Sequence, residues 1–166
     1  MKGAAAVVLA GLLGCSASSG ACEGDDAPSL ELGHRESGAW VPIADGDTLA
    51  IADAPQGGFG VPLRVRSRGL AAGNERSADI VLELARAGVE AGHFEIPGYP
   101  LLCESDDVGG TLGVQVVPLD PERFVDDADL EPLAGRTAEL FVQVTDDGGR
   151  VAEASVEVVL ELPPPE

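Results

Sequence analysis

Residues 138–160 read AELFVQVTDDGGRVAEASVEVVL, two runs of alternating side chains around a turn-forming segment. Every second position from Leu140 to Val144, and again from Val156 to Leu160, is apolar. Alternation with period two is typical of half-buried strands, whereas Asp-Gly and Gly-Gly steps favour tight turns. This stretch therefore predicts an antiparallel β-hairpin with one face in the core.

The same alternation recurs earlier in the chain. Further strands are predicted at residues 40–43, 48–51, 61–66, 80–85 and 114–116. The nearest candidate for a helix, Asp79 to Val89, is weakened by Gly88 and by the β-branched Ile80 and Val81. The sequence predicts an all-β fold, an antiparallel β-sandwich of about seven short strands spanning residues 38–162.

Leu133-Ala134-Gly135-Arg136 leads into the hairpin, and together residues 130–162 resemble the closing hairpin of immunoglobulin-like domains. The resemblance implies an immunoglobulin-like topology. The cysteine pair and core tryptophan of antibody domains have no counterparts at the expected places, since Cys22 and Trp40 both come too early in the chain.

The N-terminus has the layout of an export signal, with Lys2 followed by a short apolar run from Ala4 to Leu13. This run is shorter than the roughly 20 residues that a membrane-spanning helix needs. It ends in Leu12-Leu13-Gly14-Cys15, which resembles the lipobox of bacterial lipoproteins. The resemblance implies removal of residues 1–14 and attachment of acyl chains, palmitate among them, to Cys15.

A multiply acylated Cys15 would hold the chain on a membrane, because two or more chains give stable anchoring. Ser16 follows the cysteine where retention at the inner membrane usually requires Asp, so the outer membrane is favoured. Residues 15–37 are rich in Ser, Gly, Ala and acidic side chains and predict a flexible tether. Residues 163–166 are expected to form a short tail.

Acidic residues dominate the charge. Asp and Glu number 29 against 10 Lys and Arg, a formal net charge of −19, and Lys2 is the sole lysine. This balance disfavours nucleic acid and anionic head groups as partners. In an acidic chain, Arg64, Arg66 and Arg68 stand out as a basic stripe along one predicted strand; we expect them to pair with acids such as Glu83, or else to receive an acidic segment of a partner.

If Cys15 carries lipid, Cys22 and Cys103 are the remaining thiols. In an oxidising envelope such a pair is a candidate disulfide, although spacing alone does not decide between a bridge and two thiols. Zinc is disfavoured because the chain has only two histidines, His34 and His93, and no Cys-x-x-Cys motif.

Acidic clusters offer one candidate metal site. Asp126, Asp127 and Asp129 are the best candidates for calcium, which prefers carboxylate and carbonyl oxygens. The alternative is ordinary turn chemistry, for which Asp is well suited. No segment matches the EF-hand pattern.

The segment Gly57-Gly58-Phe59-Gly60 precedes a strand rather than the Lys-Ser/Thr and helix of a phosphate loop. We therefore expect a turn with positive φ and a close backbone approach, with Phe59 in or near the core. Together with residues 40–47, this segment is similar to uncharacterised secreted lipoproteins of myxobacteria, in which a histidine usually occupies the place of Gly60. No activity follows from that similarity.

No arrangement of nucleophile and base is recognisable, because neither His34 nor His93 lies in a motif that presents a serine or cysteine. The sequence thus predicts no catalytic residues and no enzyme. It predicts a lipid-anchored binding or structural module of the cell envelope, associated with the membrane through Cys15 and open to an envelope protein as partner. A calcium-stabilised adhesion domain is the first alternative, and an envelope enzyme of unknown reaction the second.

Overall fold

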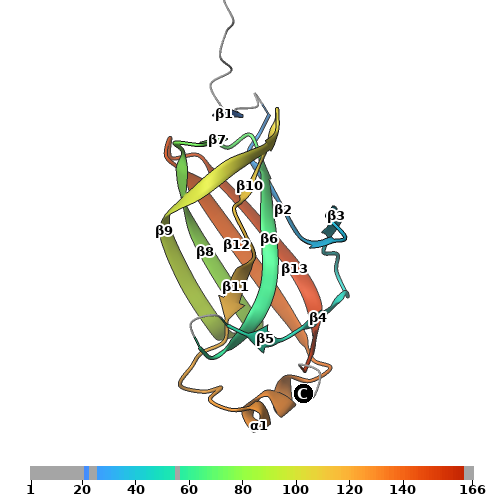
Figure 1. Cartoon of the computed structure of the whole chain (residues 1–166). Coiled ribbons are helices and arrows are strands. Elements are labelled where there is room, and N and C mark those ends of the chain that lie inside the picture. The colour runs from blue at the N-terminus through green and yellow to red at the C-terminus, as the bar shows by residue number, and fades with distance from the viewer. Residues whose placement is uncertain (1–20, 23–25, 55–56, 163–166) are drawn as a thin grey trace, which may run out of the picture.

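The computed structural model describes residues 21–22, 26–54 and 57–162. The predicted signal peptide and the predicted lipidation site, Cys15, lie outside this range. Strands make up most of it, which confirms the predicted all-β class (Figure 1). The strands are β1 (Ala21–Cys22), β2 (Ser29–Glu36), β3 (Ala39–Pro42), β4 (Thr48–Ala50), β5 (Ala52–Asp53), β6 (Phe59–Arg68), β7 (Ala72–Gly73), β8 (Ser77–Arg86), β9 (Val89–Ser105), β10 (Val108–Thr111), β11 (Gln115–Pro118), β12 (Thr137–Asp146) and β13 (Val151–Glu161).

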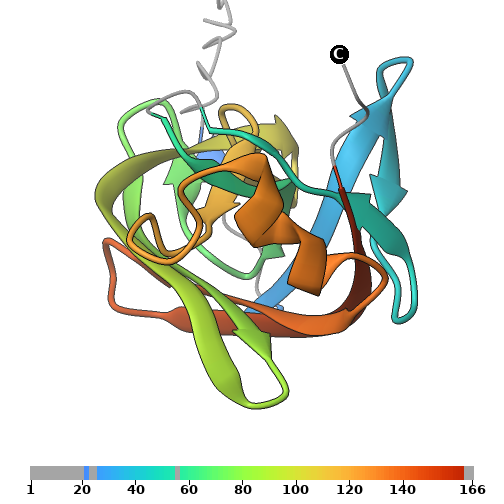
Figure 2. The same cartoon turned by 90° about the horizontal axis from the view of Figure 1, so that it is seen from below.

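The predicted sandwich of two antiparallel sheets is not confirmed. Eleven strands belong to one sheet whose main path is β3-β2-β6-β10-β9-β8-β12-β13-β4, with β5 and β11 also paired to β6. All pairs in it are antiparallel except β13 and β4, which are parallel. The sheet curls round a single interior, as the view along its axis shows (Figure 2). β1 and β7 form a separate pair at one end.

Long strands explain why the sheet stays continuous. β6 pairs with β5 and β11 through its first half and with β2 and β10 through its second half. β9 runs for 17 residues and carries the sheet from β8 to β10. Register shifts in the β8–β9 and β9–β10 ladders mark bulges, which bend and twist a sheet. Strands that change partner along their length join what would otherwise be two layers.

The interior is lined by alternate side chains of four long strands, as the period-two pattern predicts. Each of the following is at most 8% exposed: Val61, Leu63 and Val65 of β6, Ile80, Leu82 and Leu84 of β8, Leu140, Val142 and Val144 of β12, and Val156, Val158 and Leu160 of β13. Burying a side chain of this size contributes roughly 1.5–3 kcal/mol. The shared face therefore supplies most of the driving force for the curled sheet.

The predicted tether is too long at its C-terminal end. Ser29–Glu36 forms β2, whose backbone pairs with β6, and Leu32 is 4% exposed. The alternation Leu30-Glu31-Leu32 is the local signal for this strand, but it is short and lies in a polar, Ser- and Gly-rich context. The folded domain thus begins before residue 38.

The glycine cluster at residues 57–60 behaves as predicted. Gly57 and Gly58 have φ values of +92° and +78°, which side chains adopt only at a cost. A Cβ on Gly60 would lie 2.6 Å from the carbonyl oxygen of Val117 on β11. Phe59 is buried. The cluster therefore turns the chain and admits a neighbouring backbone.

Among the described residues, helix is confined to one short segment, α1 (Asp127–Leu130), which continues into a 3-10 turn at Glu131–Leu133. It covers the end of the sheet opposite β1 and β7 (Figure 1). Leu130 and Leu133 point into the core, at 0% and 2% exposed. Within the described residues no helix is long and apolar enough to cross a membrane.

A buried carboxylate ties the β12–β13 hairpin to the segment before β7. The Asp146 side chain is 0% exposed and accepts hydrogen bonds from the backbone N–H of Ala71 at 2.8 Å and of Gly148 at 3.0 Å. It also accepts from the backbone N–H of Arg150 and from its guanidinium Nε. Four donors satisfy this charge, so it stabilises the end of the sheet.

Burial opposes ionisation of Asp146, but the hydrogen bonds from Ala71 and Arg150 outweigh it and lower the pKa of this carboxyl below its ordinary value. A folded pKa below the unfolded one means that the stabilisation is present above the unfolded pKa, near pH 4, and is lost as the pH falls through the folded pKa.

We predict that Asp146→Asn lowers the free energy of unfolding by about 3 kcal/mol at pH 7, because an amide nitrogen would face N–H donors in a buried site. Urea unfolding of the wild type and the variant measures this, and the difference should shrink when both are unfolded below pH 3. Asp147→Asn is the matched control, since Asp147 makes only a surface ion pair with Arg76. Equal losses for the two variants would contradict the role assigned to Asp146.

Candidate functional site

The two ends of the curled sheet carry different chemistry. At one end, β1 and β7 lie beside the turn between β9 and β10; at the other, α1 lies beside the turn between β8 and β9 (Figure 1). The first end holds both described thiols. The second holds a hollow lined by two arginines. The two ends are considered separately.

The thiol end brings together Cys22 and Cys103, which are far apart in sequence. Cys22 on β1 pairs with Ala72 on β7, and its Sγ donates to the carbonyl oxygen of Val108 at 3.5 Å. The Sγ of Cys103 on β9 donates to the carbonyl oxygen of Ala72 at 3.4 Å. Sequence reasoning placed Cys22 in a flexible tail, whereas the structure places it in a strand and 3% exposed.

Burial and, after it, the hydrogen bond with the neighbouring Cys103 thiol together raise the pKa of Cys22 to about 12. The backbone also places the two thiols close together, since Cys22 is paired with Ala72, whose carbonyl oxygen accepts from the Cys103 thiol. Both residues are thiols in this structure. The two cysteines of the predicted candidate disulfide are therefore neighbours in the fold.

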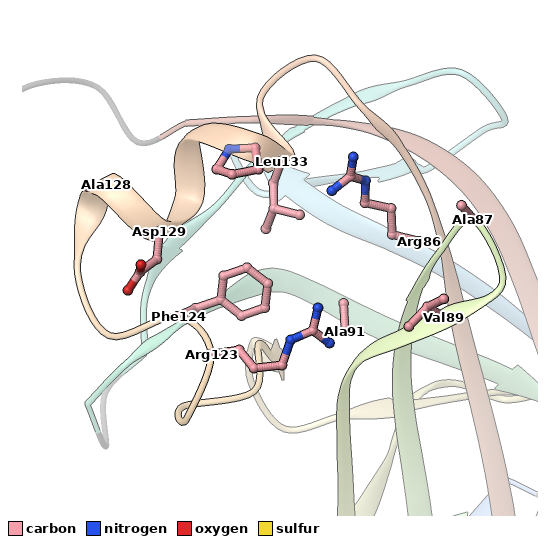
Figure 3. Close-up of a pocket in the computed structure, with 10 residues that line it drawn as sticks. Arg86, Ala87, Val89, Ala91, Arg123, Phe124, Ala128, Asp129 and Leu133 are labelled. Atoms are coloured by element: carbon pink, nitrogen blue, oxygen red, sulfur yellow. The ribbon is translucent and has the colours of Figure 1, made fainter.

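The far end contains a half-open hollow of about 550 Å³. Figure 3 shows two guanidinium groups entering it from different sides above an apolar floor. Its lining includes Arg86, Val89, Ala91, Arg123, Phe124 and Leu133. Asp129 also lines it, and its carboxylate accepts from the backbone N–H groups of Val125 and Asp126. Phe124 and Leu133 are buried at 7% and 2% exposed, whereas Val89 at the rim is 61% exposed. The hollow thus joins an apolar base to a cationic rim.

The rim is built by a tight turn between β8 and β9. Arg86 and Val89 are paired across this turn, and Ala87 and Gly88 between them have φ values of +48° and +73°. Two consecutive positive φ values define the type I′ turn that matches the twist of a hairpin. The turn holds Arg86 and Val89 at the mouth of the hollow.

The opposite wall is the loop before α1. The backbone N–H groups of Arg123 and Phe124 both donate to the Asp120 carbonyl oxygen at 3.0 Å, and the Asp120 N–H donates to the Ala91 carbonyl at 2.8 Å. Gly92 allows this contact, because a Cβ there would lie 1.7 Å from the Pro118 oxygen. The loop is therefore fastened directly to β9.

The two arginines differ in how they are held. One guanidinium Nη of Arg123 donates to the Glu90 carbonyl oxygen at 3.1 Å, and the group lies 5.5 Å from the centre of the Phe124 ring. Arg86 makes no ion pair with any described residue. In a chain of net charge −19, a cation without a carboxylate partner is available to an anion from outside.

The predicted calcium ligands serve another purpose. The Asp126 carboxylate accepts from the backbone N–H groups of Ala128 and Asp129, and that of Asp129 accepts from those of Val125 and Asp126. This reciprocal capping box starts α1. Asp127 is exposed on the first turn. Within the described part of the chain no group of three potential ligands gathers around a common point.

The arginine stripe is real, but its expected partner was wrong. Arg66 pairs with Glu104 at 2.6 Å, and Glu104 also binds Arg35 at 3.1 Å. Glu83 instead faces His93 across the β8–β9 ladder. The reason is topological, because β10 and β9 stand between β6 and β8 in the sheet.

Around Glu104, burial opposes ionisation, but hydrogen bonds from Arg66 and Arg35 outweigh it and lower the pKa of the carboxyl. The Arg66 guanidinium also lies 4.2 Å from the centre of the Trp40 ring. These contacts join β2, β3, β6 and β9. Of the stripe, Arg68 pairs with Asp107, and Arg64 donates to the Thr111 carbonyl oxygen at 3.3 Å. The stripe is thus engaged within the domain.

The histidines lie on the surface, apart from both ends of interest. His93 is flanked by Glu83 at 3.2 Å and Glu95 at 3.3 Å. Slight burial lowers the pKa of His93, but the hydrogen bonds that the ring makes to these carboxylates outweigh it and raise the pKa above its ordinary value. His34 lies 3.4 Å from Glu36. Neither histidine has a serine or cysteine among its hydrogen-bond partners in the described residues.

Sequence reasoning missed the hollow. Arg86 and Arg123 are 37 positions apart and belong to no motif, and only the fold brings them together. One signal was available: Ala87-Gly88 between two alternating runs is compatible with a two-residue hairpin turn, which would have placed Arg86 and Val89 side by side.

Comparison with known proteins gives little further guidance. No family model matches the sequence, and no curated protein matches it either. Among solved structures, a superoxide reductase (neelaredoxin) from Ignicoccus hospitalis aligns with 82% of this chain and 81% of that chain, with a TM-score of 0.34 and 14% sequence identity. A similarity this low carries no argument about chemistry or metal content.

Proposed function

We propose that this protein is a lipid-anchored, non-enzymatic binding module of the cell envelope, favouring the outer membrane, with the arginine-lined hollow as its contact site. The observation that carries the binding role is the hollow itself, in which the Arg86 and Arg123 guanidinium groups stand over buried Phe124 and Leu133. The anchor is supported by the lipobox-like Leu12-Leu13-Gly14-Cys15.

The occupant that fits the hollow is an acidic segment of another envelope protein carrying an apolar side chain. Its carboxylate would meet the guanidinium groups, which bind carboxylates through paired N–H donors. Its apolar side chain would cover Phe124 and the exposed Val89. Charge contributes to the choice of partner in two ways. The acidic surface repels anions at long range, whereas the two guanidinium groups attract a carboxylate that reaches the hollow.

The arrangement of the two ends suits this role. β1, the first described strand, lies at the end of the sheet away from the hollow (Figure 1). A lipid on Cys15, seven positions before Cys22, would therefore hold the thiol end towards the membrane. The hollow would then face away from the bilayer.

For the anchor, we predict that cells expressing the full chain incorporate labelled palmitate into it and retain it in the membrane fraction. Cys15→Ser should lose the label and release the protein, because only the thiol can carry the lipid thioether. Cys103→Ser is the control, since it removes a thiol but leaves the lipobox-like sequence intact. Equal labelling of wild type and Cys15→Ser would contradict the anchor.

For the hollow, anilinonaphthalenesulfonate is a suitable probe, because it combines an apolar ring system with one anionic group. We predict that Arg86→Gln with Arg123→Gln weakens its binding at least about fivefold, measured by fluorescence titration, since each charge-assisted contact contributes roughly 1 kcal/mol at a half-exposed site.

Arg76→Gln is the matched control, because it removes an arginine that pairs with Asp147 away from the hollow. Its binding should equal that of the wild type. Melting temperatures of all variants show whether the fold is kept. Unchanged binding in the folded double variant would refute the hollow as the contact site.

A further inference from the structure

Three strands meet at the thiol end, and each sulfur contacts the backbone next to the other cysteine. Cys22 is paired with Ala72, whose carbonyl oxygen accepts from the Cys103 thiol. Cys103 is paired with Gly109, and the carbonyl oxygen of the preceding Val108 accepts from the Cys22 thiol. The two side chains therefore approach one site from opposite strands.

Backbone hydrogen bonds alone hold β1 weakly, because β1 is only two residues long and makes one short ladder with β7. A two-residue strand contributes few hydrogen bonds, and an isolated pair of strands is marginally stable. The burial of Cys22 adds contact with the core but no covalent link. A covalent link to β9 would fix β1 to the longest strand of the sheet.

We propose that Cys22 and Cys103 form an intramolecular disulfide that fastens β1 to β9 and so sets the distance between the lipid anchor and the domain. This inference rests on the proposed envelope location, where an oxidant of the disulfide class is available. The sulfurs have to close from hydrogen-bond contact to about 2.05 Å.

The chemistry is thiol–disulfide exchange. Cys103 is the more exposed of the two thiols, so it attacks the oxidant first; its sulfur bonds to one oxidant sulfur, and the other leaves as a thiol. Cys22 then gives its proton to water, and its sulfur displaces the second oxidant thiol from Cys103. Two electrons and two hydrogens pass to the oxidant, which ends as two thiols.

The second step should be the slow one. Because burial and the contact with Cys103 raise the pKa of Cys22 to about 12, little of it is thiolate near neutral pH. The rate of ring closure is therefore expected to rise with pH across the neutral and mildly alkaline range.

The bridge also limits the reach of the anchor. Seven backbone steps separate Cys15 from Cys22, which span at most about 25 Å when fully extended. With β1 fastened, Cys22 moves with the domain, and only this segment stands between the lipid and the sheet. Without the bridge, opening of the short ladder between β1 and β7 would lengthen the connection between the lipid and the domain, which would then extend to β2.

The first test uses the full chain with Cys15→Ser, so that the two thiols in question are the only ones. We expect oxidised glutathione to remove both alkylatable thiols without adding glutathione mass, and peptide mapping to find the Cys22 peptide linked to the Cys103 peptide. The thermal midpoint should rise on oxidation by on the order of 10 °C, since the bridge closes a loop of about 80 residues.

Cys22→Ser and Cys103→Ser, each combined with Cys15→Ser, are the controls. Each substitution changes a thiol inside the fold, so each variant is compared with its own reduced state, and neither should gain melting temperature on oxidation. The proposal would be overturned if the oxidised parent kept two alkylatable thiols, or formed only glutathione adducts or dimers linked between chains.

The second test examines the natural setting. The chain purified from cells with free thiols blocked at lysis should show the Cys22–Cys103 link in its peptide map. Ring closure in vitro combined with reduced thiols in cells would overturn the envelope location while leaving the geometry intact. Palmitate labelling of the wild type reports on the anchor separately, so the two failures can be told apart.

Discussion

One apolar face, shared by β6, β8, β12 and β13, holds the structure together. Alternate side chains of these strands point to the same interior, and the sheet has to curl to bring them there. Bulges and changes of partner along β6 and β9 make that curl, because they bend strands without breaking the ladder. Core packing therefore determines the structure of the middle of the molecule, whereas polar contacts stabilise its two ends.

Hydrogen-bonded carboxylates stabilise both ends of the sheet. Asp146, with its four hydrogen bonds, closes the end that carries β1 and β7, and the Asp126–Asp129 capping box begins the short helix that closes the other. Both clusters look alike in the sequence, as pairs of acids beside a turn. Only the contacts show that one carboxylate is buried among donors, whereas the others satisfy the N-terminus of a helix.

Sequence patterning predicts the strands that have one clear apolar face, including β6, β8, β12 and β13, because period-two alternation reflects local burial. It does not predict β9, where Pro97, Gly98 and Pro100 resemble a loop. In the structure a bulge accommodates this segment, with the Gly98 N–H donating to Asp79 at 2.9 Å. Strand order is also beyond local pattern, which is why Glu83 was assigned to the wrong partner and the single continuous sheet was not predicted.

The candidate sites divide in the same way. Cys22 and Cys103 were predicted as a candidate pair by counting thiols, and the fold places both thiols at the same end of the sheet. The hollow was not predicted, because Arg86 and Arg123 belong to no sequence motif. They meet only in the fold, where a turn and a loop from different parts of the chain bring them together. In the proposed function, one end holds the module at the membrane and the other end binds the partner.

The orientation of the lipidated chain on a membrane tests this account most directly. Fluorescent amino acids placed singly at Asp106, in the turn beside the thiols, and at Val89, at the rim of the hollow, can report energy transfer to acceptors in the bilayer of reconstituted vesicles. The account predicts stronger transfer from position 106 than from position 89. Equal transfer, or stronger transfer from position 89, would contradict it.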